Sequence, residues 1–92
     1  MIKSFKHKGL RLFFEKGVSS GINSQHANKL RQRLAVIHDA KEVREINLPG
    51  YNLHPLTGDR QGQWSVTISG NWRITFEFID GDAYIVNYED YH

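Results

Sequence analysis

The chain has 92 residues and a mass of 10.7 kDa, which is enough for one domain with a single hydrophobic core. Hydrophobic residues make up 39% and charged residues 24%, a composition typical of folded globular proteins. Cysteine is absent, which excludes disulfides, thiolate zinc sites, iron–sulfur clusters and thiol catalysis. The apolar runs are too short for a transmembrane helix or the core of a signal peptide. We therefore expect a single domain over residues 1–92, located in the cytoplasm.

The net charge of +2 conceals a basic first half and an acidic second half. Residues 1–44 contain ten Lys or Arg and three Asp or Glu, a net charge of +7. Residues 45–92 contain two Lys or Arg and seven Asp or Glu, a net charge of −5. A half this basic indicates a polyanionic partner such as nucleic acid, and a solvated helical surface would explain it equally well.

The first half of the chain predicts a short strand followed by helices. Residues 1–5 are expected to form the strand, and the apolar residues that follow predict a short helix between His7 and Lys16. Gly17 suits the C-terminal end of this helix, because glycine readily adopts the left-handed conformation found there. Asn23 is a suitable N-cap for the longest helix, over residues 24–38.

The longest predicted helix has an apolar stripe and a basic face. Helical spacing predicts that four residues are buried together: Ala27, Leu30, Leu34 and Ile37. Lys29 and Arg33 lie one turn apart on another face, so we expect them to point at solvent or at a ligand. Asp39 is predicted to cap a further helix that has Glu42 at its third position and ends near Ile46.

The last thirty or so residues alternate apolar and polar side chains, a pattern typical of strands. They predict strands over 64–69, 72–79 and 84–88, joined by turns at Gly70-Asn71 and Asp80-Gly81. The fold class is therefore expected to be α+β, with an antiparallel sheet and two or three helices packed on one face.

The two-residue turns also predict which residues face each other. Counting from Asp80-Gly81 places Arg73 opposite Tyr88, with Asp90 on the same side of the sheet. The guanidinium of Arg73 would then lie on the face opposite Ile74, within reach of the chain end. A slip of one residue in the strand pairing would undo this arrangement.

Two groups of residues have side chains suited to proton transfer. The C-terminal triplet Asp90-Tyr91-His92 places an acid, a phenol and an imidazole directly after a strand. Alternatively, Tyr91 packs as a lid and its two neighbours are simply solvated. His54 precedes Pro55 and is therefore expected to be extended at the start of a surface loop, where a lone histidine is more often structural than catalytic. The five histidines show no metal-binding spacing, and no cofactor motif is present.

Three ordered motifs resemble the HigB toxins, a branch of the RelE/ParE superfamily of bacterial toxin–antitoxin systems. They are His54-Pro55-Leu56-x-Gly58-Asp59-Arg60-x-Gly62-x-Trp64-Ser65, then Asn71-Trp72-Arg73-Ile74-x-Phe76, and finally Asp90-Tyr91-His92. The opening residues 1–10 resemble the same group, so the similarity covers nearly the whole chain.

The resemblance implies a RelE-like fold and an activity that needs no metal or other cofactor. It implies an endoribonuclease that cleaves mRNA in the A site of the 70S ribosome and so inhibits translation. The implied partners are mRNA, the ribosome and a cognate HigA-like antitoxin with a helix-turn-helix motif, through which the toxin reaches operator DNA. The resemblance implies no membrane partner.

Carried over by motif position, the resemblance implies five catalytic candidates: His54, Arg73, Asp90, Tyr91 and His92. Thr57 stands where many relatives have a lysine, and Arg60 on the same loop is a candidate to replace that cation at the RNA. The basic charge of the first half adds Lys29, Arg31 and Arg33 as candidates for binding ribosomal RNA.

Two other functions compete with RNA cleavage. A ParE-like toxin would use the same fold to inhibit DNA gyrase, and a catalytically weak nucleic-acid-binding regulator would account for Thr57. His54 and the terminal Asp90-Tyr91-His92 favour cleavage, because a gyrase inhibitor has no need of these titratable groups.

Overall fold

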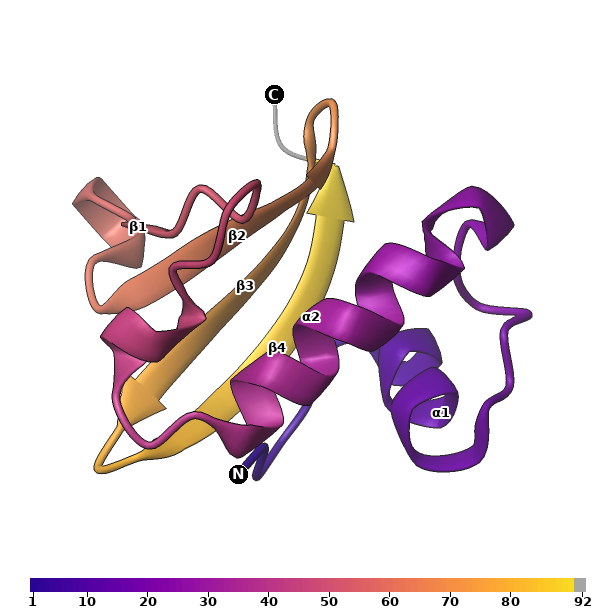
Figure 1. The fold of residues 1–92 in the computed structure, drawn as a ribbon, viewed down its shortest axis with the longest axis horizontal. Coiled ribbons are helices and arrows are strands. Elements are labelled where there is room, and N and C mark those ends of the chain that lie inside the picture. Colours follow the sequence, from indigo (N-terminus) through magenta and orange to yellow (C-terminus); the bar gives the residue numbers. More distant parts are fainter. Residues whose placement is uncertain (91–92) are drawn as a thin grey trace.

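The computed structural model describes residues 1–90 and combines a four-stranded sheet with two α-helices (Figure 1). The helices are α1 (Lys8–Lys16) and α2 (Ala27–Asp39). The strands are β1 (His54–Pro55), β2 (Gln63–Ser69), β3 (Trp72–Ile79) and β4 (Asp82–Asp90), paired antiparallel in the order β1-β2-β3-β4. Three short 3₁₀ turns complete the elements: η1 (Ser24–His26), η2 (Val43–Ile46) and η3 (Gly58–Arg60). The predicted α+β class is confirmed.

Local sequence signals explain both helices. The ring of His7 accepts a hydrogen bond from the backbone N–H of Leu10 at the start of α1, and Gly17 ends the helix with a φ of 72°. The side chain of Asn23 accepts from the N–H of Gln25, so it caps η1, which leads directly into α2. The predicted helix over 24–38 is therefore confirmed, with a 3₁₀ first turn.

The cap predicted at Asp39 is wrong. The helix α2 runs through Asp39, and the next turn, η2, begins three residues after the predicted start, with Glu42 as its N-cap. Glu42 and Glu45 form a reciprocal capping box instead, in which the Glu45 side chain accepts a hydrogen bond from the backbone N–H of Glu42. The resulting segment is a single 3₁₀ turn that ends at Ile46, as predicted.

The N-terminal segment lies beside β4 and pairs with it in parallel. Ile2 bridges to Ala83 and Phe5 bridges to Val86, as two isolated bridges rather than a continuous strand. The backbone N–H of Lys3 donates to the carbonyl of Ala83 at 2.8 Å, so the segment covers the free edge of β4.

The core fills the space between the two helices and one face of the sheet (Figure 1). From α2 it takes Leu30, Leu34 and Ile37, which are fully buried, with Ala27 partly buried at the end of the same stripe. The sheet contributes Val66, Ile68, Ile74, Phe76, Ala83, Val86 and Tyr88. Within residues 1–90, no helix has the length and apolar character needed to cross a membrane.

A bulge in β4 shifts the pairing between β3 and β4 by one residue. Glu77 pairs with Tyr84, as counting from the turn predicts, but Ile74 pairs with Tyr88 and Arg73 pairs with Glu89. The extra residue lies between Tyr84 and Asn87, where Ile85 has a φ of 48°. The predicted pairing of Arg73 with Tyr88 is therefore wrong.

Candidate active site

The sheet face turned away from the helices gathers polar residues of two of the three motifs, together with polar residues of β4. We call it the outer face. Because directly paired residues of antiparallel strands share a face, the register assigns the following residues to it, among others: His54, Ser65, Thr67, Arg73, Thr75, Asn87 and Glu89. Two of the predicted catalytic residues, His54 and Arg73, thus lie on the same face of the sheet.

The imidazole of His54 is oriented by a backbone carbonyl. Its Nδ1 lies 2.9 Å from the carbonyl oxygen of Asn52, which can only accept a hydrogen bond. The ring therefore carries a proton on Nδ1, and in the neutral form its Nε2 is left as the proton acceptor. The short strand β1 holds this histidine beside Ser65 of β2.

Arg73 lies on the outer face near the start of β3, which is flanked by β2 and β4. It pairs with Thr67 of β2 on one side and with Glu89 of β4 on the other. The adjacent Ile74 is completely buried in the core on the opposite face, so the predicted orientation of the Arg73 side chain is confirmed. This places a permanent cation with several donors on the same surface as His54.

Glu89 forms a dense hydrogen-bond network with Arg60 that sequence reasoning missed. The Arg60 guanidinium donates to both carboxylate oxygens, at 2.7 and 2.8 Å. Thr75 Oγ1 and Asn87 Nδ2 also donate to Glu89 Oε2, at 2.7 and 3.0 Å. The hydrogen bonds from Arg60, the largest influence, together with those from Thr75 and Asn87, lower the pKa of Glu89 to about 2. The only signal in the sequence was the position of Glu89 next to Asp90, which carries no information about its partner.

Asp90 lies at the end of β4 and pairs with Trp72. Side chains alternate along the strand, so Asp90 belongs to the same side as Tyr88 and not to the side of Arg73. The prediction that Asp90 and Arg73 share a face is wrong. The bulge at Ile85 moves the side chain of every later residue of β4 to the opposite face of the sheet from the one predicted. Tyr91 and His92 lie outside the described residues.

An aromatic cluster fixes the end of β4 against α2. His26 Nδ1 and the Tyr88 hydroxyl are 2.5 Å apart in a buried contact, and the ring of Trp72 lies 4.8 Å from that of Tyr88. Burial raises the pKa of Tyr88, so the phenol remains protonated. Trp72 packs against the core, and Asp90 directly follows this anchored part of the strand.

The basic residues of α2 divide into buried and exposed ones. Arg33, expected to face solvent or a ligand, is only 6% exposed: its Nε donates to the Thr67 carbonyl at 2.8 Å, and its guanidinium lies 4.3 Å from the ring centre of Tyr51. That expectation is wrong, because these partners come from outside the helix. Lys29 is exposed and donates to the carbonyl of Ile68 at 3.3 Å.

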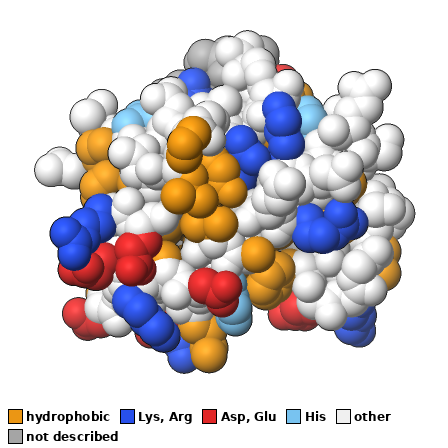
Figure 2. Space-filling model, in the orientation of Figure 1, with side chains coloured by type: hydrophobic (Ala, Val, Ile, Leu, Met, Phe, Trp, Pro, Cys, Tyr) orange, Lys and Arg blue, Asp and Glu red, His pale blue; other side chains and the backbone are white. Residues whose placement is uncertain are grey.

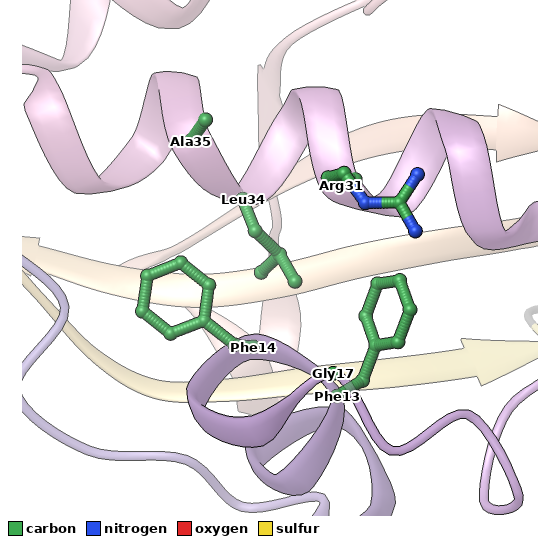
Figure 3. A pocket seen from close by; sticks show the side chains of 6 residues that line it. All are labelled: Phe13, Phe14, Gly17, Arg31, Leu34 and Ala35. Carbon is green, nitrogen blue, oxygen red and sulfur yellow. The ribbon is translucent and has the colours of Figure 1, made fainter.

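Arg31 is the exposed arginine of α2. Its guanidinium lies 5.4 Å from the ring centre of Phe13, at the rim of a groove of about 300 Å³ between α1 and α2. Figure 3 shows Leu34 pointing from α2 towards α1 at the floor of this groove. On the molecular face over α2, Lys and Arg side chains form separate groups rather than one continuous patch (Figure 2).

Comparison with known proteins assigns this chain to a family. A family model described as the RelE-like toxin HigB of type II toxin–antitoxin systems matches residues 3–92. The chain belongs to the HigB-like toxin family. It is 62% identical to a protein named Endoribonuclease HigB from Proteus vulgaris, over the full length of both chains. The resemblance inferred from the three motifs is thus confirmed.

The fold of this HigB-like chain also matches a solved structure. A crystal structure of a YafQ mutant from E. coli superposes with a TM-score of 0.60, covering 98% of this chain and 91% of that one at 18% sequence identity. At this identity the similarity concerns the fold. Among residues 1–90, no group of three His, Cys, Asp or Glu side chains gathers in the manner of a metal site.

Proposed function

We propose that this chain is a ribosome-dependent endoribonuclease that cleaves mRNA in the ribosomal A site and thereby inhibits translation. The observation that carries the proposal is the placement of His54 and Arg73 on one sheet face, in a chain 62% identical to Endoribonuclease HigB of Proteus vulgaris. A proton-transfer group and a permanent cation on one face of the sheet are what cleavage at an RNA phosphate requires.

The proposed reaction is attack by a ribose 2′-oxygen on the adjacent phosphorus. The 2′-hydroxyl loses its proton to a base, the new O–P bond forms, and the bond from phosphorus to the 5′-oxygen breaks. An acid gives a proton to that departing oxygen, which leaves a cyclic phosphate and a 5′-hydroxyl. All bonds and protons balance without a metal, a redox partner or another cofactor.

Five residues are assigned roles in this reaction. Arg73 binds the phosphate oxygens and stabilises the charge that develops on them, because its planar donors match their geometry. His54, with Nε2 free to accept a proton, and His92 carry the two proton transfers. Asp90, which is exposed at the end of β4, is assigned to orient an imidazole or to act as the base from the strand end, and Tyr91 to stack on the substrate nucleotide.

Membership of a type II toxin family implies a protein antitoxin as partner. We propose that this antitoxin is HigA-like, carries a helix-turn-helix motif and brings the toxin to operator DNA. The exposed cations Lys29 and Arg31 are proposed to contact ribosomal RNA. Because programmed ribosomes would be the site of action, the proposed compartment is the cytoplasm.

Primer extension on mRNA, with and without ribosomes, tests this function. We expect cuts in the reading frame that require ribosomes and are lost in Arg73→Lys, because a point charge does not replace the bidentate donors of arginine. Arg11→Lys, in an exposed pair with Glu15 on α1, is the matched control and should cleave normally. Intact mRNA together with relaxed plasmid DNA would instead identify a gyrase inhibitor, and intact mRNA with unchanged plasmid topology would identify a regulator.

A further inference from the structure

The Arg60–Glu89 pair connects a loop to the sheet beside the candidate catalytic residues. Arg60 closes η3 in the loop 56–62, which joins β1 to β2. Its Nη2 also donates to Gln63 Oε1 at 3.0 Å and to Thr75 Oγ1 at 3.1 Å. Both partners of the pair are partly shielded, with 32% of the Arg60 side chain and 22% of the Glu89 side chain exposed.

Besides Arg60, the β1 side of the loop is attached by the strand pairing and by Leu56, whose side chain is buried and whose N–H donates to the Gln63 carbonyl at 2.8 Å. The strand β1 contains two residues, and only His54 and Pro55 pair with β2. A two-residue strand contributes few ladder hydrogen bonds, so the side-chain network of Arg60 adds a further restraint on this region. Contacts made at Glu89 therefore contribute to the position of His54 relative to Arg73.

The charge of Glu89 is also significant, because this residue pairs directly with Arg73 across β3 and β4. An isolated carboxylate beside a phosphate-binding arginine would repel the phosphate and compete for the guanidinium. Bidentate pairing with Arg60 cancels that charge in place. The same contact thus positions the loop and keeps the surroundings of Arg73 from becoming acidic.

We propose that Glu89 is a positioning residue of this ribonuclease site. Arg60 is the counter-ion of Glu89 and attaches loop 56–62 to the sheet through it, rather than binding RNA. This inference rests on the proposed function only where it is tested by mRNA cleavage. It assigns a role to a residue outside the three motifs, and it gives Arg60 a different role from the RNA contact expected from the sequence.

A double-mutant cycle distinguishes the two roles of Arg60. The variants are Arg60→Met, Glu89→Gln and the combination of both, measured by KM and kcat for cleavage of mRNA on programmed ribosomes. We expect Arg60→Met to raise KM about tenfold, because it leaves the Glu89 carboxylate uncompensated beside Arg73. Removing that carboxylate as well should restore most of the KM in the double variant, whereas kcat should stay low because loop 56–62 remains unattached to the sheet at this point. If Arg60 binds RNA, the double variant will bind as weakly as Arg60→Met, and the inference is overturned.

A second measurement does not depend on activity. We expect amide hydrogen exchange in loop 56–62 to accelerate at least several-fold in all three variants, with a changed NMR environment of the His54 ring. The matched control is Arg11→Met with Glu15→Gln, which removes an exposed pair on α1 and should leave exchange, the His54 signal and kinetics unchanged. Unchanged exchange in Arg60→Met would overturn the positioning role.

The two proposals fail in different ways. If the wild-type chain does not cleave ribosome-bound mRNA, the proposed function is wrong, whereas accelerated exchange in loop 56–62 would still support the tie between Arg60 and Glu89. If the wild type cleaves and the double variant shows no recovery over Arg60→Met, cleavage stands and the role assigned to the pair is wrong.

Discussion

Arg73 on β3 and Glu89 on β4 face each other directly across the sheet. This relationship exists because β4 contains one extra residue at Ile85, which moves Glu89 onto the outer face and Tyr88 into the core. A local irregularity in the backbone therefore decides which charged group neighbours the candidate phosphate-binding arginine.

The first prediction concerns the support of this bulge. The backbone N–H of Ile85 donates to the Ser4 hydroxyl oxygen at 2.8 Å, so the N-terminal segment holds the bulge in place. Ser4→Ala should lower the free energy of unfolding by about 1 kcal/mol, because it leaves a partly buried donor without its acceptor. Urea denaturation measures this loss, and the exposed Ser20→Ala provides the comparison. Equal stability of the two variants would show that the hydroxyl does not support the bulge.

The regular parts of this fold were predictable from sequence, and the bulge was not. Apolar spacing, the Gly17 cap and the two hairpin turns are local signals, and each predicts an element that is present. A β-branched residue normally avoids a positive φ, so an isoleucine at position 85 does not predict the conformation that Ile85 adopts. The N–H of Ile85 is hydrogen-bonded to Ser4, which is distant in the chain, and no local pattern could reveal that contact.

The residues of the candidate site were predictable from the sequence where they belong to one of the three motifs. His54 and Arg73 were identified and lie on one face, although Asp90 was assigned to the wrong side. Arg33 and Glu89 were misjudged or missed for a common reason. Whether a charged side chain faces solvent depends on tertiary partners, and helical or strand periodicity does not specify those partners.

The second prediction follows from the lowered pKa of Glu89. A carboxylate whose pKa is lower in the folded state stabilises the fold above its unfolded pKa, here the ordinary value of 4.5, and loses that contribution as pH falls towards about 2. Glu89→Gln should therefore cost about 1–3 kcal/mol at pH 7 and show a shallower loss of stability on acidification than the wild type. Thermal melting between neutral pH and about pH 2.5 tests this.

Glu15→Gln is the control for this pH dependence, because Glu15 belongs to an exposed pair with Arg11 on α1. Its melting curve should follow the wild type at every pH, since exposed ion pairs contribute little. If Glu89→Gln also loses stability in parallel with the wild type below pH 4.5, the network around Glu89 does not account for acid sensitivity.

The third prediction separates the two arginines of α2. Arg31→Gln should flatten the salt dependence of ribosome binding by about one unit of slope for each phosphate that the chain no longer neutralises, with little change in stability. Arg33→Gln should do the reverse and lower the free energy of unfolding by about 1–3 kcal/mol, because it breaks the interactions with Thr67 and Tyr51. Binding titrations at several salt concentrations and urea denaturation measure the two effects. An unchanged slope in Arg31→Gln would assign this surface to solvation or to the antitoxin.

The last prediction concerns the chain end. The strand pairs described within residues 1–90 do not involve His92, so we expect its deletion to leave the melting temperature the same. If His92 transfers a proton in the reaction, single-turnover cleavage of mRNA on programmed ribosomes should slow by about 10²–10⁴-fold, with ribosome binding retained. Cleavage at the wild-type rate would leave His54 and Asp90 to carry both proton transfers. A loss of activity that follows melting or failed binding would instead assign His92 a structural role.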